Sequence, residues 1–198
     1  MKSRILLASA AALALVACGG DRDERAAAGN GAMDNMAMDN MATAGAGNAA
    51  MTDAPMPANG NEYATMAAAS DMFEIESSKL AVEKSQNPQV REFAQMLIRD
   101  HEKSTADLKT AAQQAVPVIV VAPALTPEQQ ANLAALRAAS AADFDRLYIR
   151  QQIPAHEKAA AMLRSYSQGG DVDSLKSHAT AVIVPVEMHL ERVRGMQM

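Results

Sequence analysis

The chain has 198 residues, a formal net charge of −5, only 3% aromatic residues and a single cysteine, Cys18. The acidic balance argues against nucleic-acid binding, and one cysteine excludes an intrachain disulfide. A hydrophobic content of 49% that is rich in alanine and poor in aromatics is typical of helices that pack closely through small side chains. The composition therefore predicts an all-α protein.

Residues 1–17 have the features of a bacterial lipoprotein signal peptide. Lys2 and Arg4 precede the apolar run ILLASAAALALVA, which is too short to span a bilayer comfortably, and the run ends in LVAC. This ending resembles a lipobox, in which the cysteine is lipidated and becomes the mature N-terminus. We therefore expect a lipid anchor on Cys18, with an ordinary secretory signal as the alternative. No Asp follows Cys18, which favours the outer membrane of a bacterial cell envelope, facing the periplasm.

A linker rich in Met, Ala, Gly and Asn is predicted over residues 18–62, and it is expected to be disordered because it has no helical or strand period. It contains the tract MDNMAMDNM. Thioether sulfur is a soft ligand that suits Cu(I). The tract therefore suggests a Cu(I) site, with compositional drift or a sink for oxidants as the alternatives; its methionines are Met33, Met36, Met38 and Met41.

From Tyr63 onward the sequence has the 3.6-residue period of amphipathic helices. A first helix is expected over residues 63–85, and a second begins at Pro88. The apolar segment VPVIVVAPAL is expected to be an extended crossing connection, after which TPEQ restarts the helical pattern with a capping box. That pattern runs to Tyr166 with a break near Ser140, and Asp171 or Asp173 is expected to cap a last helix. Four main helices, two close hairpins and one longer connection predict a four-helix bundle over residues 63–196.

One polar side chain from each main helix lies on or beside the predicted inner face. On the first helix, Glu76 falls on a stripe with Met66, Phe73 and Leu80. Carboxylate and imidazole groups that converge inside a bundle can hold a transition metal such as iron, zinc or copper. The alternative is a set of core polar groups that bond to one another, to tyrosine hydroxyls or to carbonyls freed by prolines. The candidate ligands are Glu76, His101, His156 and His189, with Asp100 and Tyr148 as polar groups behind them.

A di-iron oxidase is disfavoured, because that chemistry uses Glu-x-x-His on two helices. The residues three positions before the three candidate histidines are Ile98, Ile153 and Val186. No enzyme is therefore expected. His178 falls between helix faces and is expected at the surface.

Three segments of the chain resemble one bacterial family: FEIESSKLAVEKSQNPQVREFAQMLIRDHEKSTADL, FDRLYIRQQIPAHEKAAAML and LKSHATAVIVPVEMHLERV. The family is the ferritin-like DUF4142 family, whose members are often labelled outer-membrane proteins. Pro154 departs from the family pattern, which tends to have a polar residue there. The residues that carry the resemblance are Leu80-Ala81, Asp100-His101, Phe144-Asp145, Tyr148, His156, Pro185 and His189-Leu190.

The resemblance implies a ferritin-like bundle but no settled biochemical role. We therefore expect a membrane-anchored lipoprotein that presents the bundle as a non-enzymatic binding or envelope-stress module. The alternative is a metal-handling protein that uses the methionine tract, the bundle histidines or both.

Overall fold

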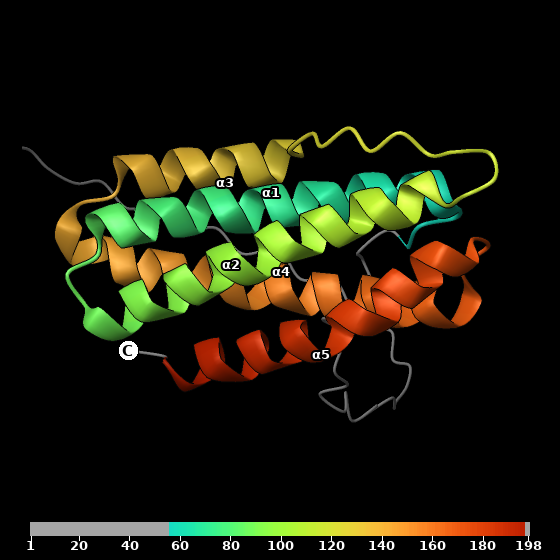
Figure 1. Ribbon diagram of the computed structural model, residues 1–198. Coiled ribbons are helices and arrows are strands. Elements are labelled where there is room, and N and C mark those ends of the chain that lie inside the picture. The colour runs from blue at the N-terminus through green and yellow to red at the C-terminus, as the bar shows by residue number, and fades with distance from the viewer. Residues whose placement is uncertain (1–55, 197–198) are drawn as a thin grey trace, which may run out of the picture. The chain divides into compact units, whose positions relative to one another are not determined.

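The computed structural model describes residues 56–196 (Figure 1), and this part of the chain forms helices without any strand. The helices are α1 (Gly60–Lys84), α2 (Pro88–Gln113), α3 (Pro127–Ala138), α4 (Ala141–Gly169) and α5 (Asp173–Gly195). The all-α prediction is confirmed. None of these helices is long and apolar enough to cross a membrane. The predicted signal peptide, Cys18 and the tract of Met33, Met36, Met38 and Met41 lie outside the described residues.

The four long helices form the predicted four-helix bundle. Helices α1 and α5 each pack against both α2 and α4, so α1 and α5 lie on one diagonal and α2 and α4 on the other. Short turns join α1 to α2 and α4 to α5, and each of these pairs is antiparallel (Figure 1). The extended segment 114–126 and helix α3 then carry the chain over α1 to the start of α4. One long crossover of this kind is the connectivity of ferritin-like bundles.

Local capping chemistry explains most of the helix boundaries. Asn87 accepts a hydrogen bond from the Gln89 amide and Pro88 occupies the first turn of α2, while Thr126 and Gln129 form the predicted capping box of α3. Ser140 accepts from the Asp143 amide, and this cap separates α3 from α4.

Two helix starts differ from the sequence prediction. Helix α1 begins at Gly60, three residues before Tyr63, because the Asn59 side chain accepts from the Glu62 amide and caps it. Helix α5 has Val172 at its N-cap position, with no side-chain cap. Asp171 does not cap α5, because its carboxylate accepts a hydrogen bond from the Tyr166 hydroxyl at 2.9 Å.

The inner face of α1 is not the predicted one. Glu76 was expected inside the bundle, but its side chain is 39% exposed and pairs with Lys79 at 3.3 Å. That prediction was wrong, because α1 turns a face of small and polar residues into the bundle, which a search for large apolar side chains does not detect. The buried residues of α1 are Gly60, Tyr63, Ala64, Ala67, Ala68, Ala69, Asp71, Phe73, Glu74, Ser77, Ser78 and Ala81.

The apolar core consists of two clusters, one toward each end of the bundle. Tyr63, Leu108, Leu163 and Leu175 belong to the first, and the second contains Phe93, Phe144 and Leu190 among others. Between them lies a belt of buried polar residues that we call the mid-bundle polar layer. The layer comprises Asp71, Glu74, Ser77 and Ser78 of α1, His101 and Ser104 of α2, Gln152 and His156 of α4, and His189 of α5.

Lys84 connects the end of α1 to the end of α3. Its ammonium donates to the carbonyl oxygens of Leu136, Arg137 and Ala139 at 2.9, 2.7 and 3.0 Å. These carbonyls lie in the last turn of α3 and at its C-cap, where a cation is favourable.

We expect Lys84→Met to lower the free energy of unfolding by about 1–2 kcal/mol, because the charged donor is lost while the aliphatic chain is kept. Urea denaturation measures this change. Lys79→Met is the matched control, since Lys79 only pairs with Glu76 on the same exposed helix face, and it should change stability by less than about 0.5 kcal/mol. Equal effects of the two substitutions would contradict the proposed role of Lys84.

Candidate metal centre

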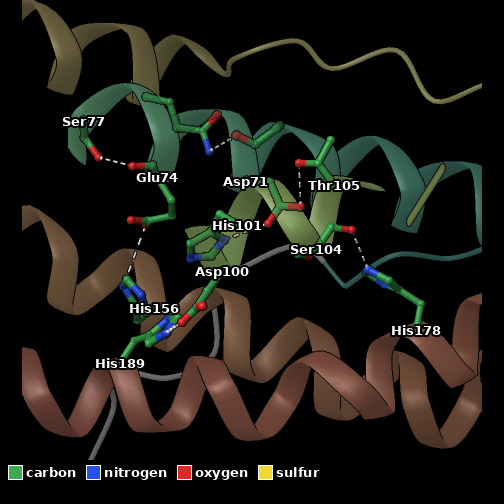
Figure 2. A network of polar contacts seen from close by, with 12 residues as sticks. Asp71, Glu74, Ser77, Asp100, His101, Ser104, Thr105, His156, His178 and His189 are labelled. Atoms are coloured by element: carbon green, nitrogen blue, oxygen red, sulfur yellow. Dashed lines mark hydrogen bonds and ion pairs between the residues drawn. The ribbon is translucent and has the colours of Figure 1, made fainter. Parts of the chain in front are cut away.

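Three histidines from three different helices meet in the mid-bundle polar layer (Figure 2). His101 comes from α2, His156 from α4 and His189 from α5, and their side chains are almost fully buried. The ring centroids lie 5.9 Å apart for His101 and His156, 5.7 Å for His101 and His189, and 5.6 Å for His156 and His189. One nitrogen atom from each ring lies within 4.8 Å of those from the other two. The bundle therefore brings these three predicted ligands together.

One nitrogen of each ring is held by an acceptor. His101 Nδ1 lies 2.8 Å from Asp71 Oδ1, and His189 Nε2 lies 2.8 Å from Asp100 Oδ2. His156 Nδ1 lies 2.9 Å from the backbone carbonyl of Gln152. A carbonyl or an ionised carboxylate only accepts hydrogen bonds. Each of these ring nitrogens therefore carries a proton and donates it.

The remaining nitrogen of each ring has no partner, and in the neutral imidazole it carries a lone pair. His101 Nε2, His156 Nε2 and His189 Nδ1 are buried and have no hydrogen-bond partner within residues 56–196. A buried acceptor left unpaired is destabilising by about 1–3 kcal/mol. These three nitrogens therefore do not fit the alternative in which the histidines are core polar groups with all their hydrogen bonds made. Imidazole rings that cluster in this way, each with one N–H group held by a carboxylate or carbonyl and the other nitrogen unpaired, have the arrangement of metal-ligating histidines.

The carboxylate behind His101 is itself held in place. Asp71 is buried, and its second oxygen accepts a hydrogen bond from the Thr105 hydroxyl at 3.2 Å. Thr105 thus orients the carboxylate that orients the ring (Figure 2). The carboxylate of Asp100 has the same role for His189 but is 43% exposed. Asp100 was predicted as a polar group behind the ligands, whereas Asp71 and Thr105 were not identified from the sequence.

Glu74, and not Glu76, is the glutamate of the layer. Its Oε1 lies 3.8 Å from His156 Nδ1, which is too long for a hydrogen bond, and its buried Oε2 has no partner in the described part of the chain. Burial raises the pKa of Glu74 to about 7. Its carboxyl group lies beside His156 on the side away from the ring's free lone pair.

Burial also decides the charge of the histidines. It lowers the pKa of His156 to about 3, with His101 contributing, and it lowers the pKa of His189. Burial likewise pushes the pKa of His101 down, but the hydrogen bond and the charge of Asp71 outweigh it, so this pKa is raised. His156 and His189 are therefore neutral at pH 7 and have a lone pair available for a metal, while Asp71 and Asp100 supply negative charge beside it.

Two other predicted positions differ from expectation. The Tyr148 hydroxyl pairs with Ser78 at 2.8 Å and not with a histidine. His178 is 5% exposed, so its predicted surface position was wrong. Its Nε2–H donates to the Ser104 carbonyl at 3.2 Å and its Nδ1 accepts from the Tyr63 hydroxyl at 2.7 Å. Both nitrogens of His178 are satisfied, which makes it a buried histidine of the ordinary structural kind.

The sequence profile of the family described as domain of unknown function DUF4142 matches residues 27–196. This chain belongs to the DUF4142 family. No curated protein sequence matches this DUF4142 chain.

Solved structures share the fold of the DUF4142 chain. CopM in the Cu(I)-bound form has a TM-score of 0.58 at 23% identity, covering 70% of this chain and 94% of that one. CopM in the Cu(II)-bound form has a TM-score of 0.61 at 23% identity, covering 72% and 97%. A DUF305 fragment from Deinococcus radiodurans has a TM-score of 0.62 at 14% identity, with the same coverage. At these identities the likeness establishes the fold.

The low pKa of His156 makes the stability of the metal-free protein depend on pH. An unfolded histidine binds a proton below pH 6.5, whereas folded His156 does so only near pH 3. This residue therefore lowers the stability of the wild type as the pH falls through that window, by up to about 1.4 kcal/mol per pH unit.

His156→Leu removes this contribution. In the presence of a chelator, the stability of the variant relative to the wild type should rise by about 2–3 kcal/mol between pH 7 and pH 4.5. Urea denaturation at several pH values checks this. A stability difference that does not change with pH would show that folded His156 titrates normally.

Proposed function

We propose that this protein binds one transition-metal ion between His101, His156 and His189, and that it stores or transfers that ion. Two observations on the same three buried rings carry the proposal: each ring has one nitrogen without a hydrogen-bond partner, and the rings bring one nitrogen each within 4.8 Å of one another. Of the two functions that the sequence left open, metal handling is favoured over a binding module without metal. A binding module alone gives no reason to keep three unpaired acceptors in the middle of a core.

Copper is the ion we propose. Imidazole ligands suit copper, zinc, nickel or iron, and among the divalent ions Cu(II) is held most tightly by nitrogen ligands. The site lies between two apolar clusters, and no cysteine is present among residues 56–196. The ion would therefore be held by imidazole nitrogens with carboxylates behind them, and a proton on the free nitrogen of His101 would leave as the ion binds. The structures of similar fold in the Cu(I)-, Cu(II)- and Ag-bound forms support this choice.

We propose that the protein stores or transfers the metal ion and does not use it in catalysis, because the three histidine rings are deeply buried. His101, His156 and His189 are 3%, 1% and 3% exposed. The cavity that touches His101 has a volume of about 10 Å³, which is room for about one water molecule and not for an organic substrate.

The envelope location is a proposal of the same kind. A lipid on Cys18 would tether the bundle to a membrane, and the methionine tract at residues 33–41 would add soft ligands to the chain between anchor and bundle. Cys18→Ser should abolish labelling by fatty acid in cells. A variant that is labelled and fractionates like the wild type would rule out the anchor.

A metal titration tests the centre directly. We expect the full chain to bind Cu(I) at the bundle in competition with a chelator, and we expect His101→Leu, His156→Leu and His189→Leu each to weaken that binding at least 100-fold, because two imidazoles remain of three. His178→Leu is the matched control, since it removes a buried histidine whose two nitrogens are already satisfied.

The His178 variant should therefore bind as the wild type does. Replacing Met33, Met36, Met38 and Met41 by Leu in all of these proteins removes any contribution of the tract. If the three histidine variants bind as tightly as the His178 variant in this background, the proposed centre is wrong.

The carboxylates behind the ligands should matter almost as much as the ligands. In Asp71→Asn an amide replaces the carboxylate behind His101. Its N–H₂ group can donate a hydrogen bond to His101 Nδ1, and the ring proton then moves to Nε2, the nitrogen that would bind the metal. We expect Asp71→Asn to weaken Cu(I) affinity by about 10–100-fold. Glu76→Gln changes a carboxylate that lies outside the layer and should have no effect. A normal affinity in the Asp71 variant would show that the hydrogen bond from His101 does not set its tautomer.

A further inference from the structure

We infer that a soft monovalent ion reaches the histidine centre through a groove between α1, α3 and α4, and that the thioether of Met162 passes it from that groove to the centre. This inference rests on the proposed function. Two cavities that share one wall carry it.

The outer cavity is a groove of about 250 Å³ with mostly apolar walls. Met66 and Phe73 of α1 and Met162 of α4 line it. Glu128 of α3 and Lys158 of α4 also line the groove, and they pair at 2.9 Å with side chains that are 65% and 51% exposed. The groove therefore reaches solvent beside this ion pair.

The inner cavity, of about 10 Å³, lies among α1, α2, α4 and α5. Asp71 and His101 line it, whereas His156 and His189 do not, so the cavity meets the metal centre at His101. Three residues line both cavities: Ser70, Ala159 and Met162. An ion that moved past this shared wall would leave the groove and meet the ring of His101 and the carboxylate of Asp71.

The chemistry of the shared wall selects the ion. Ala159 offers no side-chain ligand, and the Ser70 hydroxyl is a hard one. Met162 offers a soft thioether on an unbranched chain with three rotatable bonds, which can turn without backbone movement. It is 5% exposed and lies six residues after His156 on α4, a rise of about 9 Å along the helix. With Met66 on the groove side, the route presents two thioethers before the imidazoles.

A cation that enters an apolar passage must replace its water by protein ligands. Thioether sulfur binds Cu(I) and Ag(I) but is a poor ligand for Zn(II). Met162 should therefore speed the loading of soft ions without holding them at equilibrium, where the three histidines bind more strongly. The carboxylate of Asp71, in the inner cavity, attracts the ion onward.

The test measures the rate at which the protein takes up Cu(I). Cu(I) is supplied as its bicinchoninate complex to the full chain in the background without the four tract methionines, and the loss of the complex's absorbance reports transfer. We expect Met162→Leu, which keeps the side-chain volume, to slow transfer at least tenfold while the final occupancy stays that of the wild type. Met96→Leu is the matched control, because Met96 packs against the other apolar cluster and lines neither cavity.

The outcomes separate the two proposals. A protein with Met162 intact that takes up no Cu(I) overturns the proposed function. Normal uptake with the same rate in the Met162 and Met96 variants overturns the access route alone. A lower final occupancy in Met162→Leu makes Met162 a ligand of the bound ion, which also overturns the route. Zn(II) uptake, followed with a zinc indicator, should have the same rate in both variants. Equal slowing of Zn(II) and Cu(I) would mean a steric effect and would remove the role of the thioether.

Discussion

The hydrogen bond between the Asp71 carboxylate and His101, 2.8 Å long and buried, is the interaction on which the centre depends. An acceptor behind the ring holds the proton on the outer nitrogen and leaves the inner lone pair free. The Gln152 carbonyl and Asp100 do the same for His156 and His189. Without these acceptors the rings could share protons with one another, and the cluster would be an ordinary hydrogen-bonded core.

The centre also determines how the bundle is built. A continuous apolar core along four helices would be the more stable design, because each unpaired buried acceptor is destabilising. This bundle instead places polar residues from all four long helices at one level, with apolar clusters toward both ends. The clusters stabilise the fold on both sides of this layer. An ion bound there would add stability according to its affinity and concentration, because the unfolded chain does not hold the three rings together.

Short-range rules explain which parts of the fold were predictable. Asn87 with Pro88 and Thr126 with Pro127 begin helices through a side-chain cap and the fixed backbone of proline, so these boundaries are readable in the sequence. Gly170 ends α4 where a Cβ atom would clash with the carbonyl and ring of Tyr166. His101 and His189 repeat with valines and leucines at helical spacing, so their burial was readable too. His178 was misplaced because its burial depends on Tyr63 and Ser104, which belong to other helices.

The sequence by itself determined the four long helices, the crossover between them and the three inward histidines, because these depend on local propensity and on the apolar stripes of α2, α4 and α5. Only the tertiary structure decided which acidic side chains accompany them. Glu74 and Glu76 stand two positions apart, which is about 200° around a helix, and the sparse stripe of Met66, Phe73 and Leu80 on α1 favoured the wrong one of the two. Packing against α2 and α4 sets that rotation, and with it the placement of Asp71 and Glu74 behind the histidines.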